Sequence, residues 1–137
     1  MADMSGKCLC GKVTFTAVNV KTGYHVCHCE MCRKWNGGPT MAVPVGKIVF
    51  PNEEYLGLYE SSDWAERGFC KNCGTNLLYR IKAGDHTSVW VGAFDDQTAF
   101  KLFDEIYIDS KPDSYAFAGE HPRLTEEQTL KAFGVKS

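Results

Sequence analysis

The sequence has 137 residues, of which 44% are hydrophobic and 23% are charged. These values are typical of a soluble globular protein, and we expect residues 1–137 to form a single domain. The formal net charge of −2 and the pI near 6.1 provide no basic surface for a phosphate backbone, so we expect no nucleic-acid partner. The N-terminus lacks the features of a secretory signal, and no apolar stretch approaches the roughly 18 residues of a membrane-spanning helix. We therefore expect a cytoplasmic protein with no membrane partner.

Short segments rich in β-branched and aromatic residues predict most of the secondary structure. Residues 13–17 alternate apolar with polar side chains, and residues 40–50 are rich in Val and Ile but interrupted by Pro44 and Gly46. Further strands are expected at residues 55–60, 66–69, 75–81, 87–93 and 105–109. Clusters of Gly, Asn, Asp and Ser separate them and suit turns. Regularly spaced short strands favour an antiparallel β fold.

One helix is predicted, at the C-terminal end. Residues 125–128, Thr-Glu-Glu-Gln, match a capping box, and Gly134 offers an end to the helix. Leu124, Leu130 and Phe133 are expected to anchor this helix on the rest of the protein. The fold class is therefore mainly β with a short C-terminal helix.

The seven cysteines are the most informative feature of the composition. An odd number cannot pair completely as disulfides within one chain, and clustered cysteines in a reducing cytosol are more often metal ligands or catalytic thiols. They form three groups: Cys8 and Cys10; Cys27, Cys29 and Cys32; and Cys70 and Cys73. Four thiolates make a closed structural zinc site, whereas three leave the metal an open position for water or substrate. Seven ligands divide naturally into four and three.

The spacing leaves two ways to combine these groups. An ordinary zinc ribbon would join Cys29 and Cys32 to the pair at 70 and 73. However, glycine follows Cys10 and Cys73, and a zinc knuckle often needs positive φ after its second cysteine. Cys32 is followed instead by Arg33 and Lys34, which suits a site that presents cations to an anionic ligand. We therefore favour one site of Cys8, Cys10, Cys70 and Cys73, and another of Cys27, Cys29 and Cys32.

Three sequence blocks also carry a family resemblance. Residues 8–15 (CLCGKVTF), 27–34 (CHCEMCRK) and 69–75 (FCKNCGT) resemble, in order and spacing, the glutathione-dependent formaldehyde-activating enzyme family. The similarity extends from residue 6 to about residue 115, and the combination of three blocks is far more specific than any one of them.

The resemblance implies a fold, a metal content and an activity. The fold would be of the Mss4-like type, with antiparallel β-sheets around a structural zinc. Two zinc ions per chain are implied: one held by the first and last cysteine pairs, and a catalytic one held by Cys27, Cys29 and Cys32. The activity would be that of a carbon–sulfur lyase of the S-(hydroxymethyl)glutathione synthase type, with glutathione as co-substrate and formaldehyde or a related aldehyde as its partner.

The chemistry of a three-thiolate zinc agrees with a thiol substrate. Zinc with three thiolate ligands is a weaker Lewis acid than zinc with three histidines, and is less suited to making hydroxide. We favour a glutathione thiolate in the open position, with polarisation of the aldehyde oxygen as the alternative. A competing thiol would also make this zinc labile. Arg33 and Lys34 are the candidate partners of the glutathione carboxylates, although a role as ordinary surface charges is equally consistent with the sequence.

The remaining candidates receive simpler interpretations. We expect His28 to be an exposed loop histidine without a role, with a proton shuttle or a fourth zinc ligand as alternatives. Residues 35–38 are expected to form a turn with one buried aromatic side chain, and Trp64, Trp90 and Phe94 are expected to lie in the core. A non-catalytic, zinc-stabilised binding module is the alternative function. The additional cysteine triplet favours the enzyme, because a purely structural module needs only four cysteines.

Overall fold

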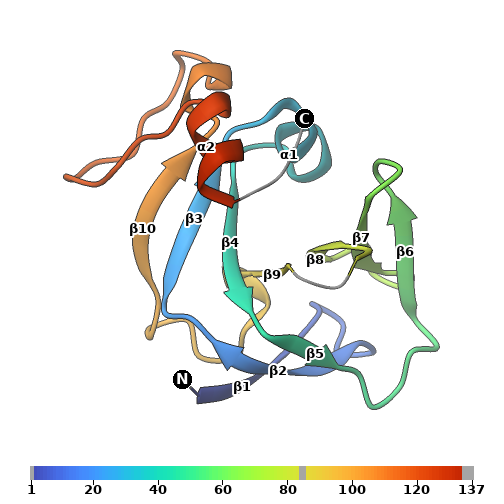
Figure 1. The fold of residues 1–137 in the computed structure, drawn as a ribbon. Coiled ribbons are helices and arrows are strands. Elements are labelled where there is room, and N and C mark those ends of the chain that lie inside the picture. The colour runs from blue at the N-terminus through green and yellow to red at the C-terminus, as the bar shows by residue number, and fades with distance from the viewer. Residues whose placement is uncertain (1, 84–85, 134–137) are drawn as a thin grey trace.

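The computed structural model describes residues 2–83 and 86–133, which form short strands, two short α-helices and two 3₁₀ turns (Figure 1). The strands are β1 (Ala2–Lys7), β2 (Thr14–Val20), β3 (Gly23–Cys27), β4 (Thr40–Val45), β5 (Lys47–Val49), β6 (Leu56–Glu60), β7 (Ala65–Cys70), β8 (Asn76–Ile81), β9 (Thr87–Trp90) and β10 (Lys101–Ile106). The helical elements are α1 (Glu30–Asn36), η1 (Val91–Ala93), η2 (Ile108–Ser110) and α2 (Glu126–Phe133).

The strands form two sheets. A three-stranded sheet has the order β1-β2-β5, and a seven-stranded sheet has the order β10-β3-β4-β9-β8-β7-β6. Neighbouring strands are antiparallel, except that β10 runs parallel to β3. Figure 1 shows the long strands β3, β4 and β10 on one side, the β6–β8 strands on the other, and the small sheet beneath them. The mainly β fold class is therefore confirmed.

The principal core lies between the small sheet and the adjacent strands of the large sheet. Phe15 of β2, Val43 of β4 and Leu78 of β8 are buried there together with Phe94. The rings of Phe15 and Phe94 meet edge to face, with their centroids 5.7 Å apart. The alternating apolar residues of 13–17 supply the inward face of β2, which is why that pattern predicted a strand.

Most of the predicted strands are confirmed. Residues 40–50 divide at Gly46 into β4 and β5, and the predicted segments at 55–60, 66–69 and 75–81 correspond to β6, β7 and β8. The segment at 87–93 forms β9 and then turns into η1, whereas the segment at 105–109 contains only the last two residues of β10. The strand therefore begins earlier than predicted, because Lys101 already pairs with Gly23 of β3.

Helix α2 confirms the predicted capping box. The Thr125 hydroxyl accepts a hydrogen bond from the Gln128 amide at 3.2 Å, and the Gln128 side chain accepts one from the Thr125 amide at 2.9 Å. The helix begins at Glu126 and reaches Phe133, while Gly134 lies outside the described residues. No helix in residues 2–83 and 86–133 has the length and apolar character needed to cross a membrane.

Two predictions about local structure are wrong. Residues 35–38 do not form an isolated turn, because Trp35 and Asn36 belong to α1, which ends at Gly37 with φ 77°. Trp64 is not a core residue, since 49% of its surface is exposed at the tip of the β6–β7 hairpin. Trp90 and Phe94 are buried, as expected.

Candidate metal centres and the adjoining cavity

The first and last cysteine pairs meet in space. The four sulfur atoms of Cys8, Cys10, Cys70 and Cys73 all lie within 4.8 Å of one another. The Cys8 and Cys10 sulfurs are 3.6 Å apart, and those of Cys10 and Cys70 are 3.8 Å apart. A tetrahedral zinc with Zn–S bonds of about 2.3 Å requires sulfurs roughly 3.8 Å apart. The donor set therefore fits a closed zinc site in number, type and spacing.

The turns that present these cysteines depend on glycine. Gly11 and Gly74 have φ values of 82° and 81°, in the left-handed region that glycine adopts without strain. Their amides donate to the carbonyl oxygens of Cys8 and Cys70. The positive φ expected after each second cysteine is thus confirmed, although these amides bond to carbonyls. The Cys70 sulfur accepts instead from the amide of Cys73 at 3.4 Å.

The middle cysteines form a second, separate group. The sulfurs of Cys27, Cys29 and Cys32 also lie within 4.8 Å of one another. Cys27 ends β3, Cys29 is the N-cap of α1, and Cys32 lies one turn into that helix. The Cys29 sulfur accepts a hydrogen bond from the Cys32 amide at 3.4 Å, so a cysteine takes the place of the usual capping oxygen. The start of α1 therefore determines the geometry of the triplet, which fits a metal with one position left open.

Arg67 is a charged residue beside the triplet, and the sequence analysis did not identify it. It lies on β7 with 3% of its surface exposed, and its Nη2 is 3.7 Å from the Cys32 sulfur. Its guanidinium also stacks over the Tyr79 ring, 5.1 Å from the centroid. The Nε and Nη1 atoms of Arg67 are buried and have no hydrogen-bond partner within the described part of the chain. The signal in the sequence was an arginine at an inward-facing position of a predicted strand.

The charges of the triplet are strongly coupled. Hydrogen bonds from Cys27 and Cys29, and then the charge of Arg67, hold the pKa of Cys32 well below its usual range. Hydrogen bonds with Cys29 and Cys32, together with burial, raise the pKa of Cys27 well above its usual value. A thiolate at Cys32 paired with a buried guanidinium is therefore the favoured charge state in the absence of metal.

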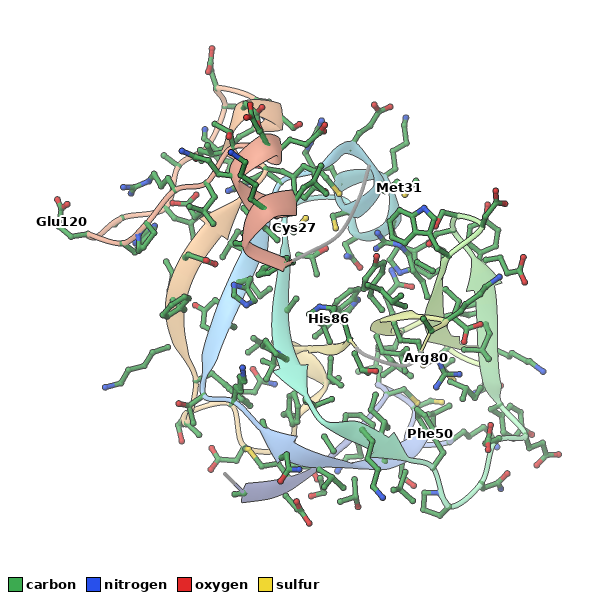
Figure 2. All side chains as sticks on the ribbon, viewed as in Figure 1. Cys27, Met31, Phe50, Arg80, His86 and Glu120 are labelled. Atoms are coloured by element: carbon green, nitrogen blue, oxygen red, sulfur yellow. The ribbon has the colours of Figure 1, made fainter. Side chains whose placement is uncertain are left out.

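A cavity of about 600 Å³ adjoins the triplet and Arg67. All three cysteines of the triplet contribute to its wall, and so does Lys34. Arg33 is not among the described residues that line it, and its Nε donates to the carbonyl of His28 at 3.0 Å. In Figure 2, Cys27 and Met31 lie near α1, and His86 lies farther along, between β4 and β8. All three of these residues line the cavity.

The prediction for His28 is wrong, because this side chain is fully buried. Its Nε2 donates to Glu105 of β10 at 2.7 Å, and its Nδ1 lies 2.9 Å from the Tyr115 hydroxyl. The other oxygen of Glu105 accepts from His121 at 2.5 Å and from Arg123 at 2.9 Å. Both ring nitrogens are engaged, so neither is placed as a fourth ligand, and His28 is not among the described residues that line the cavity where a proton shuttle would act. It instead anchors the backbone between Cys27 and Cys29 to β10.

Fold and site together define a class of protein: a mainly β domain with one closed four-cysteine cluster and one three-cysteine cluster that opens onto a cavity. A family model described as glutathione-dependent formaldehyde-activating enzyme matches residues 3–110. The chain therefore belongs to the glutathione-dependent formaldehyde-activating enzyme family.

Two relatives extend this comparison. The chain is 34% identical over 136 residues to the uncharacterised lyase C29B12.13 of Schizosaccharomyces pombe, a match that covers 96% of this chain and 98% of the relative. A crystal structure of a Rhodobacter sphaeroides protein superposes with a TM-score of 0.57 at 21% identity, covering 88% of this chain and 99% of that one. The latter supports the fold alone.

Proposed function

We propose that the protein is a zinc-dependent carbon–sulfur lyase that acts on the glutathione adduct of formaldehyde or a related aldehyde. The observation that carries this proposal is the placement of three cysteine sulfurs, within 4.8 Å of one another, on the wall of a cavity of substrate size. Family membership supports it, as does a relative that is itself named a lyase. A non-catalytic binding module needs only the four-cysteine structural site, so the second, three-cysteine cluster beside a cavity favours the enzyme.

The two cysteine groups have different roles in this proposal. Cys8, Cys10, Cys70 and Cys73 hold a structural zinc that joins the start of the chain to the β7–β8 turn. Cys27, Cys29 and Cys32 hold the catalytic zinc. When bound there, zinc supplies an electrophilic centre that keeps a thiol in its thiolate form at neutral pH.

The reaction is an addition in one direction and an elimination in the other. In synthesis, the sulfur of glutathione forms a bond with the carbonyl carbon, the C=O π bond opens, and the thiol proton ends on the oxygen. Negative charge develops on that oxygen as the bond forms. Arg67 lines the cavity beside the triplet, and its Nε and Nη1 make no hydrogen bond within residues 2–83 and 86–133, so we assign to its guanidinium the stabilisation of this oxygen.

Helix α1 offers contacts for the charged ends of glutathione. Glu30 and Lys34 are exposed, line the cavity and lie one helical turn apart. Lys34 pairs with a glutathione carboxylate, and Glu30 pairs with its ammonium group. Of the two basic residues that follow Cys32, Lys34 takes this role, because Arg33 donates to the His28 carbonyl instead.

Exchange spectroscopy tests the proposal directly. Glutathione and formaldehyde interconvert with their adduct without a catalyst, so the measured quantity is the increase in exchange rate when protein is added. We expect a clear increase with wild-type protein and none with Cys32→Ser at equal folded concentration. If wild-type protein gives no increase and glutathione does not protect the triplet from alkylation, the non-catalytic binding module becomes the better interpretation.

A further inference from the structure

The cavity is much larger than formaldehyde requires. Its volume is about 600 Å³, equal to roughly 20 water volumes at about 30 Å³ each. Formaldehyde has two non-hydrogen atoms and fills only a small fraction of this space. Glutathione takes up part of the remainder, and Glu30 and Lys34 of α1 offer partners to its charged groups.

Part of the cavity wall is aromatic and apolar. Trp64 lies at the β6–β7 hairpin, Ile81 at the end of β8, Trp90 at the end of β9 and Phe133 at the end of α2, and all four line the cavity. These side chains come from four different segments that meet at the one cavity. Their apolar surfaces offer contact area to a ring or an alkyl chain.

Folding leaves part of this apolar surface uncovered. Met31 and Trp64 are each 49% exposed and Phe133 is 37% exposed, although all three lie at the same cavity. Large apolar side chains that stay exposed around one concave site favour an apolar ligand, because the ligand removes their surface from water. Tyr79 and His86 continue the wall, with their rings edge to face and centroids 6.5 Å apart.

The same wall contains polar atoms without partners. The Nε1 of Trp90 and the hydroxyls of Ser61 and Ser62 are buried and make no hydrogen bond within residues 2–83 and 86–133. All three residues line the cavity. Because these atoms are themselves enclosed, they place no polar group on the cavity surface and leave the apolar character of this wall unchanged.

We propose that the carbonyl substrate is an aldehyde with an aromatic or extended apolar substituent, which packs against Trp64, Trp90 and Phe133 while its carbonyl carbon lies at the triplet. This inference rests on the proposed function, since it assumes that a thiol adds to an aldehyde at Cys27, Cys29 and Cys32. The thiol S–H adds across the C=O bond, so no oxidant, reductant or leaving group is required.

The test compares formaldehyde, acetaldehyde and phenylacetaldehyde as partners of glutathione. Acetaldehyde and phenylacetaldehyde differ by one phenyl ring, and the uncatalysed rate of each is subtracted. We expect kcat/KM for phenylacetaldehyde to exceed that for acetaldehyde and for formaldehyde by roughly tenfold or more. A formaldehyde rate equal to or above that of phenylacetaldehyde overturns the inference and leaves the proposed function standing. No acceleration with any of the three overturns both.

Two variants locate the substituent. Trp64→Ala should lower kcat/KM for phenylacetaldehyde about tenfold more than it lowers kcat/KM for formaldehyde. Tyr59→Ala is the matched control, because Tyr59 is 56% exposed on β6 and is not among the described cavity residues. Ala42→Phe fills the cavity from β4 and should exclude phenylacetaldehyde while sparing formaldehyde. Equal effects of either cavity variant on both aldehydes would overturn the placement of the substituent.

Discussion

At the scale of single residues, the site depends on two buried charged groups of opposite sign. Arg67 lies at the cavity wall beside Cys32, and Glu105 contacts His28, which lies between Cys27 and Cys29 in the chain. Each is almost fully buried, with 3% and 1% of its surface exposed. Burial of a charge is costly unless it is paired, and the two residues meet this requirement differently. Glu105 is surrounded by donors, whereas Nε and Nη1 of Arg67 make no hydrogen bond within the described part of the chain.

Replacement of Arg67 should reduce catalysis more than stability. We expect Arg67→Gln to lower kcat by about 100-fold, because removing a donor from a developing oxyanion typically has an effect of this size. Arg67→Lys, which keeps the charge but loses the planar donors, should recover only part of the rate. The measurement is the adduct exchange rate at saturating glutathione.

Arg80→Gln is the control for Arg67→Gln, since Arg80 lies on the neighbouring strand and pairs with Glu66. A fall in activity matched by an equal fall in bound zinc would contradict a direct role.

Glu105 should couple stability to pH. Burial alone would raise the pKa of Glu105, but hydrogen bonds from His121 and His28 and the charge of Arg123 outweigh it and lower the pKa below its ordinary value of 4.5. A lowered folded-state pKa means that the stabilisation is present above pH 4.5 and is lost as pH falls through the folded-state value. We expect Glu105→Gln to lower the free energy of unfolding by about 3 kcal/mol at pH 7. This difference from wild type should shrink below pH 4.5.

Urea unfolding at a series of pH values checks this expectation. Both proteins are compared in the same buffers, so that effects of acid on the cysteine clusters are common to both. Glu60→Gln is the control, because Glu60 pairs with Lys82 on the surface and 72% of its side chain is exposed. A difference between wild type and Glu105→Gln that stays constant down to the acid limit would contradict the assignment.

At the scale of elements, the cysteine turns combine a metal ligand with a required backbone conformation. Gly11 and Gly74 have positive φ, and a Cβ added at either position would meet no atom within 4 Å. A substitution by alanine there is therefore strained by the backbone alone. Gly38 has equally open surroundings but no positive φ, so it serves as an internal control.

Alanine at Gly74 should destabilise the fold by about 1–2 kcal/mol, the cost of the left-handed conformation for a residue with a Cβ. Gly11→Ala should behave in the same way. Gly38→Ala should be neutral or slightly stabilising, since it also restricts the unfolded chain. The measurement is the free energy of unfolding in urea with zinc present. Equal effects at positions 38 and 74 would show that chain entropy, rather than the cysteine turn, explains the result.

The elements also show which parts of the structure could be predicted from the sequence. β2 and the capping box of α2 rest on local patterns, so the sequence predicts them. β1 has no β-rich composition and forms because it pairs along β2. α1 has seven residues, one buried side chain and a cysteine as N-cap, so it carries neither an apolar stripe nor a standard cap.

At the scale of the whole molecule, long-range pairing creates the features that no local pattern predicts. The parallel pairing of β10 with β3 brings Glu105 against His28, which lie 77 positions apart in the chain. The cavity likewise forms only when β4, β7, β8 and both helices come together, because each of them supplies lining residues. The grouping of cysteines was accessible from sequence because glycine marks two of the turns. The roles of Arg67 and of the aromatic cavity residues could not be predicted, since they depend on contacts with residues far along the chain.

Loss of one cysteine from each cluster should separate stability from activity. Metal analysis of protein purified without chelator should find about two equivalents of zinc in wild type. Cys70→Ser should abolish folding, because Cys70 is fully buried and its cluster joins segments on either side of the core. Cys32→Ser should lose about one equivalent of zinc and all catalysis while keeping the β-sheet signal in circular dichroism, since β3 and β4 still pair beyond the triplet. Unfolding of both variants to the same extent would show that both clusters are structural and that the cavity lacks a separate reactive centre.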